Sequence, residues 1–280
     1  MRIAVTGATG LVGHPVARYL AGRGHQVTTV GRRPLPGLPH IPWDLRGEPP
    51  DLHAQDHLVH AAFAHVPDRY RGGEGDDPDG FVASNLEGTL ALWQAARAAD
   101  VHTVFLSSRA VFDGYPAGTV LTETTALRPV DLYGRIKVEA EDALGVGGAS
   151  IRATGVFGPP VPGRRHKWAD LIDRYRKGER VEPRVATEVH STDLARAIEI
   201  VLERELRGVA LHASGFLLDR RDLLEHYARV SGIAGALPER SDPAQLRVMD
   251  TSDLLALGWT PSGPESLPAV MRAIVADEAA

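Results

Sequence analysis

The sequence predicts an α/β fold built on a doubly wound parallel sheet, with a smaller α/β lobe in the C-terminal part. Short apolar runs alternate with amphipathic stretches through the first half of the chain, which is typical of parallel strands joined by crossover helices. After residue 153 this alternation gives way to glycine- and proline-rich segments with scattered helices. With 280 residues, 43% of them hydrophobic, the chain is long enough to bury a sizeable core.

Compact runs of β-branched and aliphatic residues are the candidate strands, because strands covered on both faces are apolar throughout. They span residues 2–6, 26–30, 57–61, 103–107 and 150–152. Apolar residues at three- and four-residue steps predict the helices between them. These helices span residues 11–21, 81–99 and 132–144, followed in the C-terminal part by 167–177, 192–205 and 220–231.

The composition excludes several classes of protein. The chain has no cysteine, so a disulfide framework, a cysteine-based zinc site and an iron–sulfur cluster are ruled out. Its 31 basic and 36 acidic side chains give a net charge of −5. Proteins that bind nucleic acid usually have an excess of basic residues instead. No apolar run approaches the roughly 18 residues of a membrane span or resembles a secretory signal. We therefore expect no nucleic acid, no membrane, no metal site and a cytoplasmic location.

A glycine-rich turn, Thr6-Gly7-Ala8-Thr9-Gly10-Leu11-Val12-Gly13, joins the first strand to the first helix. In such a turn one glycine permits the tight reversal, one lets a pyrophosphate approach the backbone, and one lets helix and strand pack closely. The helix N-terminus offers its free N–H groups to the phosphates. This context predicts a Rossmann-type dinucleotide site, a turn without ligand being the alternative. The candidate cofactor contacts are Gly7, Thr9, Gly10, Leu11, Val12 and Gly13.

The chain is expected to divide where Gly155-Val156-Phe157-Gly158-Pro159-Pro160 interrupts regular structure. Residues 1–153 would form the dinucleotide-binding core. Residues 154–280 would form mainly the substrate-binding lobe, with residues 186–213 returning to the core.

The end of the second strand indicates which dinucleotide is bound. NAD-type sites carry an acid about 20 residues beyond the glycines, where it accepts hydrogen bonds from the ribose hydroxyls; this chain has Gly31-Arg32-Arg33 instead. A guanidinium binds a 2′-phosphate that a carboxylate would repel. We therefore predict NADP(H) in preference to NAD(H), held by Arg32 and Arg33, with Asp44 and Leu45 passing the adenine. The alternative is that both arginines are simply solvated.

A catalytic pair is predicted on the helix at 132–144, where Tyr133 and Lys137 lie one turn apart on one face. A free tyrosine has a pKa near 10, and a nearby ammonium lowers that value toward neutrality. Ser107 and Ser108 end the preceding strand, at the sheet edge where α/β proteins bind ligands. A serine there can bind a substrate carbonyl oxygen while Tyr133 transfers the proton. The opposing interpretation is a surface tyrosine beside a solvated lysine.

Together these motifs resemble the extended short-chain dehydrogenase/reductase family, in particular its NAD(P)-dependent epimerase, dehydratase and sugar-nucleotide reductase branch. Tyr133 and Lys137 match the family's Tyr-x-x-x-Lys, and Ser107–Phe112 is similar to its Ser-Ser-x-x-Val-Tyr strand end. The resemblance implies that Ser108, Tyr133 and Lys137 are catalytic. It also implies a possible homodimer through the helices near 81–99 and 132–144. Further cofactor contacts that it implies are Ala61, Ala62, Asn85, Ser107 and Val156, together with Tyr133 and Lys137.

The substrate site is less well marked. The nucleotide-sugar branch usually has an arginine just before the strand that leads into its His-x-x-Asp signature, but Val185-Ala186-Thr187-Glu188-Val189 has none. The substrate is therefore a sugar nucleotide or a smaller polyol, sugar or other carbonyl compound. The basic run Arg164-Arg165-His166-Lys167 could bind an anion or be a solvated loop. The candidate substrate residues are Ser108, Arg109, Arg164, Arg165 and Arg184.

The predicted activity is hydride transfer at a carbonyl or carbinol centre, with Tyr133 as proton donor, Ser108 polarising the oxygen and Lys137 tuning the tyrosine. Net redox chemistry, epimerisation and dehydration all remain open. The rival from another class is a non-catalytic NADP-binding sensor or scaffold on the same fold.

Overall fold

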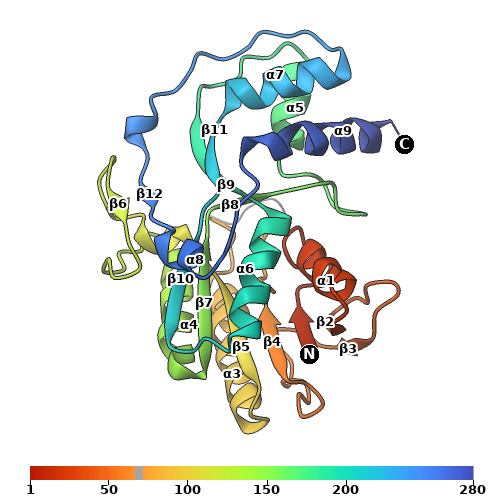
Figure 1. The fold of residues 1–280 in the computed structure, drawn as a ribbon, viewed down its shortest axis with the longest axis vertical. Helices are drawn as coiled ribbons and strands as arrows, with labels where there is room; N and C mark the ends of the chain where they lie inside the picture. The colour runs from red at the N-terminus through yellow and green to blue at the C-terminus, as the bar shows by residue number, and fades with distance from the viewer. Residues whose placement is uncertain (67–71, 280) are drawn as a thin grey trace.

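In the computed structural model, which describes residues 1–66 and 72–279, seven parallel strands form the central sheet (Figure 1). Across the sheet they are β10 (Val209–Ala213), β7 (Gly148–Ala153), β5 (His102–Ser108), β4 (His57–His60), β1 (Arg2–Thr6), β2 (Gln26–Gly31) and β3 (His40–Pro42). The chain order reverses between β1 and β4. Ligands of open α/β sheets bind at such a switch point, outside the carboxyl ends of the strands.

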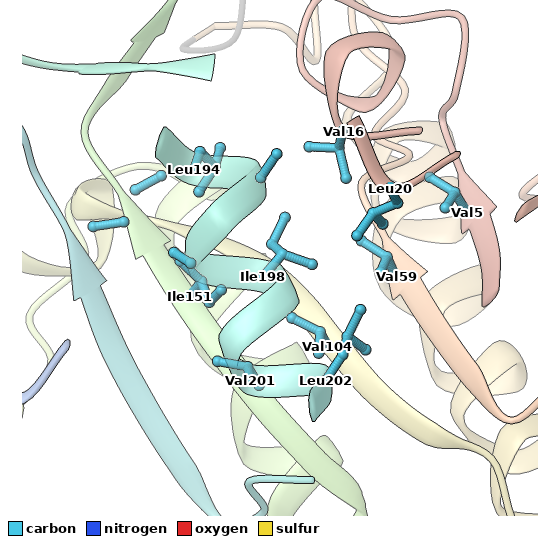
Figure 2. Packing of buried hydrophobic residues seen from close by; sticks show 14 of the residues in the cluster. Val5, Val16, Leu20, Val59, Val104, Ile151, Leu194, Ile198, Val201 and Leu202 are labelled. Atoms are coloured by element: carbon cyan, nitrogen blue, oxygen red, sulfur yellow. The ribbon is translucent and has the colours of Figure 1, made fainter. Parts of the chain in front are cut away.

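Helices cover both faces of this sheet. α1 (Gly13–Gly22) and α6 (Ser191–Glu203) pack on one face, and α3 (Gly88–Ala98) and α4 (Leu132–Leu144) on the other. In β1, Ile3 and Val5 belong to the cluster with α1 and α6, whereas Ala4 belongs to the opposite cluster. This alternation follows from the two-residue period of a strand. Figure 2 shows the α6 side chains of Leu194, Ile198 and Leu202 above the sheet residues.

The C-terminal lobe has a small sheet and a hydrophobic core of its own (Figure 1). Its strands are β11 (Phe216–Asp219), β9 (Val185–His190) and β8 (Gly155–Phe157), with β9 antiparallel to β11 and parallel to β8. Its helices are α5 (Ala169–Arg176), α7 (Arg220–Ser231) and α9 (Leu267–Glu278). After β9 the chain leaves the lobe: α6 packs on one face of the large sheet and β10 joins that sheet at its edge. The chain returns to the lobe at β11.

The short elements complete the chain: α2 (Pro78–Val82), β6 (Val120–Leu121), β12 (Val248–Met249) and α8 (Ser252–Ala256). The strands and helices expected from the sequence are present, with ends shifted by three residues at most. The helix expected at 81–99 begins earlier, at Pro78, because the Asp77 carboxylate accepts the N–H of Gly80 and caps it. A π-helical turn at Ala83–Glu87 joins α2 to α3. Within the described residues, no helix is long and apolar enough to cross a bilayer.

Candidate active site

The glycine turn after β1 has the close contacts that its sequence predicts. Gly7 has a φ of +68°, and a Cβ there would lie 2.7 Å from the backbone nitrogen of Ala62. A Cβ at Gly13 would lie 2.3 Å from the Gly7 carbonyl oxygen, so α1 packs directly on the turn. A Cβ at Gly10 would meet only that same oxygen, at 3.2 Å, among the described atoms. The Gly10 backbone therefore remains open to a ligand, as a dinucleotide site requires.

A buried hydrogen-bond chain fixes the end of β4 against this turn. The Thr6 hydroxyl oxygen accepts the N–H groups of Ala61 and Ala62, both at 3.1 Å. His60 Nδ1 lies 2.8 Å from the same oxygen, and His60 Nε2 lies 3.1 Å from the Thr89 hydroxyl oxygen. Because the Thr89 hydroxyl donates its proton to the Asn85 carbonyl, His60 must donate through Nε2 and accept from Thr6 through Nδ1.

His60 is neutral in this arrangement. Burial lowers the pKa of His60 to about 3, because an imidazolium would lose its hydration. Ala61 and Ala62 thus lie against the glycine turn, and their contact with a cofactor stays a prediction. His60 and Thr89 were not predicted as site residues.

Asn85 holds the chain that follows β4. Its Oδ1 accepts the N–H of Ala64 at 2.6 Å, and its Nδ2 donates to the carbonyls of Ala64 and Phe81 at 2.7 and 3.0 Å. Both amide protons are therefore used within the protein, which gives Asn85 a positioning role beside the site. Its direct contact with a cofactor stays a prediction.

Tyr133 and Lys137 come together at the carboxyl end of β5. Asp131 caps α4 by accepting the N–H of Gly134 at 2.7 Å. Lys137 Nζ donates to the Leu106 carbonyl at 2.8 Å and lies 4.6 Å from the ring centroids of Phe63 and Phe105. It lies 5.8 Å from the ring centroid of Tyr133. Burial lowers the pKa of Lys137 to about 7, because the charged amine loses its hydration. A desolvated amine therefore lies near Tyr133.

The aromatic surround of this pair includes Phe63, which the sequence did not single out. Its ring meets Tyr133 edge to face, with centroids 5.0 Å apart. Phe63 follows the small pair Ala61-Ala62, so the same turn that closes on the glycines also supplies the ring beside Tyr133.

Both serines lie where the sequence places them, at the end of β5. The Ser108 hydroxyl accepts the N–H of Ala110 at 3.2 Å, and a Cβ at Gly134 would lie 3.0 Å from the Ala110 carbonyl oxygen. The start of α4 therefore packs against the turn that follows Ser108. The buried Ser107 hydroxyl has no hydrogen-bond partner among the described residues. A buried polar atom in this state indicates a group still to be bound, which fits a dinucleotide at this edge.

The two arginines after β2, Arg32 and Arg33, are exposed. Arg32 Nε lies 3.8 Å from an Asp44 carboxylate oxygen, with the two side chains 78% and 51% exposed. Leu45 follows Asp44, and a Cβ at Gly88 would lie only 1.9 Å from the Leu45 carbonyl oxygen. The segment at 44–45 is therefore docked on the start of α3, and Asp44 partly neutralises the arginine expected to bind phosphate.

The basic run at 164–167 reaches different parts of the molecule. Arg164 Nε donates to the Thr9 carbonyl at 2.9 Å, across the two lobes and onto the glycine turn. Arg165 is instead bonded to the carboxylates of Asp170 and Asp173 on α5. The structure thus separates two residues that the sequence grouped together as substrate contacts.

Of the two remaining candidate substrate arginines, Arg109 lies next to a carboxylate and Arg184 is exposed. Arg109 lies 3.3 Å from Asp113 within the turn after β5. Arg184 is exposed at the start of β9, where its carbonyl accepts the N–H of Arg220 at 2.9 Å. Their substrate contacts stay predictions.

A small pocket lies where the glycine turn meets the C-terminal lobe. Val156, which the sequence assigns to the cofactor, lines it on β8, and Leu11 lines it from the glycine turn. Lys167, His166 and Ser191 supply its polar wall. His166 and Lys167 belong to the basic run that the sequence analysis considers for anion binding, whereas Ser191 was not predicted as a site residue.

A titratable cluster lies elsewhere, where the loop between α1 and β2 meets α6. The ligand atoms of His25, Glu199 and Glu203 lie within 4.8 Å of one another. Glu199, however, already accepts hydrogen bonds from Tyr19 and Arg23 at 2.8 and 3.0 Å. These bonds occupy the carboxylate that a cation would need.

The parallel sheet, the glycine turn at its switch point and the tyrosine–lysine helix beside it define a dinucleotide-binding enzyme of the Rossmann class. The sequence profile of the NAD dependent epimerase/dehydratase family matches residues 3–212. The chain belongs to this family.

Similar proteins are found along nearly the whole chain. It is 26% identical to a UDP-glucose 4-epimerase of Corynebacterium glutamicum, over 99% of this chain and 94% of the relative. It is 28% identical to a 3-diazoavenalumate denitrifying reductase of a Streptomyces species, over 94% of this chain and 97% of the relative. Among solved structures, MoeE5 in complex with UDP-glucose and NAD has the same fold, with a TM-score of 0.81, 23% identity and full coverage of both chains.

Proposed function

We propose that this protein is an NAD(P)-dependent oxidoreductase or epimerase that moves hydride at a carbonyl or carbinol centre. Its substrate would be a sugar, a sugar nucleotide or a similar small polar compound. The observation that carries this proposal is the buried amine of Lys137, which donates to the Leu106 carbonyl at the end of the strand that also carries Ser108. Tyr133 lies one turn before it on α4. A proton donor, its tuning amine and a hydroxyl at one ligand-binding edge are the parts that carbonyl reduction needs.

The cofactor would lie across the carboxyl ends of β1, β4 and β5. When bound, it would accept or supply the hydride at its nicotinamide ring. The residues that would hold it are Gly7, Thr9, Gly10, Leu11, Val12, Gly13, Arg32, Arg33, Asp44, Leu45, Ala61, Ala62, Asn85, Ser107, Tyr133, Lys137 and Val156. Two features support this placement: the Ser107 hydroxyl, which has no partner within the described part of the chain, and the open Gly10 backbone.

Three side chains would carry the proton chemistry. Ser108 would donate a hydrogen bond to the substrate oxygen and orient it. Tyr133 would give that oxygen its proton in reduction and take it back in oxidation. Lys137 would hold the cofactor ribose and, when charged, favour the phenolate of Tyr133. Because the pKa of Lys137 is about 7 in the free protein, this electrostatic help is strongest below neutral pH.

The proposed preference for NADP(H) depends on Arg32 and Arg33. Two guanidinium groups after β2 would bind a 2′-phosphate, and no acid takes the position from which NAD-type sites bind the ribose. The similar structure of MoeE5 holds NAD, so the preference needs a direct measurement with both cofactors.

The proposal is tested by Tyr133→Phe, with Tyr115→Phe as the matched control because the Tyr115 hydroxyl donates to Ala126 outside the site. Aldoses, uronates and nucleotide sugars are screened with NADPH and NADP⁺ at the nicotinamide absorbance band. Tyr133→Phe should lower turnover by about two to four orders of magnitude and leave NADPH binding within about twofold. Undiminished turnover would remove Tyr133 from its role. Product formed without a net absorbance change would identify epimerisation.

We also propose a homodimer through the helices near 81–99 and 132–144. α3 and α4 lie side by side on one face of the sheet (Figure 1), which would let two copies pair their helices. Sedimentation of the purified protein measures the assembly state, and a monomer at micromolar concentration would contradict the proposal.

A further inference from the structure

One face of α4 carries a third polar residue in step with the tyrosine and the lysine. Tyr133, Lys137 and Glu141 follow one another at four-residue intervals, so their side chains lie one turn apart on the same side of the helix. The Glu141 side chain is nonetheless buried, with only 6% of it exposed. A carboxylate in such a place is costly unless a cation and hydrogen bonds compensate its charge.

Arg152 of β7 supplies this compensation. Its Nε lies 3.2 and 3.1 Å from the two carboxylate oxygens of Glu141, and its Nη2 donates to Oε2 at 2.6 Å. Its Nη1 donates to the Glu123 carbonyl at 3.4 Å, and its guanidinium carbon lies 5.1 Å from the ring centroid of Phe112. Both members of the ion pair are therefore fixed in position, and the pair is held by charge-assisted hydrogen bonds.

The ion pair lies close to the edge of the sheet where the cofactor is proposed to bind. Arg152 is the register partner of Ser107 on β5, and register partners in parallel strands direct their side chains to the same face. Lys137 donates to the carbonyl of Leu106, the residue before Ser107. The ion pair and the buried amine are therefore neighbours over the same end of β5.

Two buried histidines interact with these cations in the neutral form. The charge of Lys137 acts on His60 of β4, and that of Arg152 acts on His212 of β10. Burial lowers the pKa of His60 to about 3 and the pKa of His212 to about 4, because an imidazolium would lose its hydration. Neither imidazole therefore brings a positive charge to this region at pH 7.

Charged side chains also reach this region from the elements packed around α4. They are Arg97 of α3, Arg109 and Asp113 of the turn after β5, and Glu123 of the loop after β6. At the amine itself two effects oppose each other. Burial lowers the pKa of Lys137, and the charge of Glu141 raises it, because a nearby carboxylate favours the ammonium form.

We infer, resting on the proposed function, that Glu141 is a positioning residue whose carboxylate, fixed by Arg152, keeps the amine of Lys137 in its charged form beside Tyr133. The proposed reaction needs that form, because a cation favours the phenolate and offers three donors. The aromatic surround of the amine opposes the charge, whereas the carboxylate one turn away supports it. A neutral side chain at position 141 would leave Lys137 uncharged over more of the pH range around 7.

The test measures the titration of Lys137 directly, which is feasible because the chain contains three lysines, at 137, 167 and 177. The full-length protein is labelled with ¹³C-lysine, and NMR follows each side-chain Cε signal through a pH titration, with and without NADPH. Lys137→Met identifies the signal of Lys137 by its loss. Glu141→Gln removes the charge at nearly constant shape. Glu139→Gln, at an exposed position of the same helix, is the matched control.

In Glu141→Gln the pKa of Lys137 should fall by at least about 0.5 pH unit, because a charge one turn away is lost. Glu139→Gln should match the wild type within about 0.2 pH unit, because solvent screens an exposed charge. A smaller fall in a folded Glu141→Gln overturns the inference and leaves the ion pair as a structural anchor of α4. Melting temperatures show which variants are folded.

Glu141→Gln leaves the guanidinium of Arg152 buried without its countercharge, so this variant can fail to fold. In that case the double variant Glu141→Gln with Arg152→Met decides, because it has no unpaired buried charge at this place. A Lys137 pKa at least about 0.3 pH unit below that of the wild type supports the inference, and a smaller difference overturns it.

Turnover separates this inference from the proposed function. With a compound that the Tyr133 screen identifies, the alkaline limb of the kcat/KM profile of Glu141→Gln should move to lower pH by the shift that NMR measures. A limb that stays in place while the pKa of Lys137 falls overturns the inference. If the wild type turns over no compound, the proposed function fails, and the NMR titration still decides whether Glu141 sets the charge of Lys137.

Discussion

The amine of Lys137 lies 2.8 Å from the carbonyl oxygen of Leu106 and 4.6 Å from the ring centroids of both Phe63 and Phe105. An amine buried in this way is costly in its charged form, and its pKa of about 7 expresses that cost. Lys137 is one of three lysines in the chain, yet it takes the least favourable position for a charge. A charge desolvated in this way does not help stability, which supports the proposed role of Lys137.

We therefore expect Lys137→Met to stabilise the protein while it abolishes activity. The folded pKa of about 7 lies below the ordinary 10.5, so the folded state carries the full cost of the buried charge below pH 7. That cost falls as the pH rises from 7 toward 10.5, because the folded amine is then neutral. The stability gain of Lys137→Met should shrink by about 2–3 kcal/mol between pH 6 and pH 9.

Urea denaturation at the two pH values measures this change. Lys177→Met on the exposed surface should change stability by less than about 0.5 kcal/mol at either pH. A Lys137→Met variant that is less stable than wild type at pH 6 would show that the buried charge is compensated.

Asp44 should weaken the binding of NADPH, because it lies 3.8 Å from Arg32. Asp44→Asn is expected to tighten NADPH binding by about two- to fivefold and to change NADH binding little, since exposed ion pairs contribute about 0–1 kcal/mol. Arg32→Ala with Arg33→Ala should weaken NADPH far more than NADH. Fluorescence titration with both cofactors measures the two effects, and an unchanged ratio in the double-arginine variant would discredit the 2′-phosphate argument.

Arg164 should slow the release of the cofactor, because its guanidinium ties the C-terminal lobe to the Thr9 carbonyl. One such hydrogen bond contributes about 1 kcal/mol, so Arg164→Ala should release NADPH about three- to tenfold faster. Arg165→Ala is the control, since that side chain binds α5 instead. Stopped-flow displacement of NADPH gives both rates, and equal rates in the two variants would refute the role of Arg164.

His60 should make the protein sensitive to acid. Its folded pKa of about 3 lies below the ordinary 6.5, so the unfolded chain binds a proton between these values and the folded protein does not. Stability is therefore lost as the pH falls from 6.5 toward 3. His60→Gln removes this titration, and the stability difference from wild type should change by about 3 kcal/mol between pH 7 and pH 4.

Chemical denaturation across this range measures the difference. His53→Gln, at a side chain 73% exposed, should follow the wild type at each pH. If the free energy of unfolding of the wild type and of His60→Gln changes with pH in parallel, His60 is charged or exposed in the folded protein.

Much of the framework follows from local pattern. The strands of the large sheet, the glycine turn and the tyrosine–lysine helix each depend on residues close together in the chain, and the structure and the family match confirm the fold and the enzyme class. The roles of individual site residues stay predictions. Phe63, His60 and Thr89 were not predicted as site residues, because each makes its contact with a residue distant in the chain. They reach the site only through β4 and α3, which meet after folding.

The sequence by itself determined the fold, the family and the order of chemistry-bearing residues along the chain, because helix and strand periods and glycine spacing are local properties. Only the tertiary structure decided which charges are free. Arg164, Arg165 and Lys167 look alike in the sequence, but one binds a distant carbonyl, one binds its own helix, and one is neutralised by Glu188. Electrostatic partners are set by distance in space and by burial, and neither can be read from spacing along the chain.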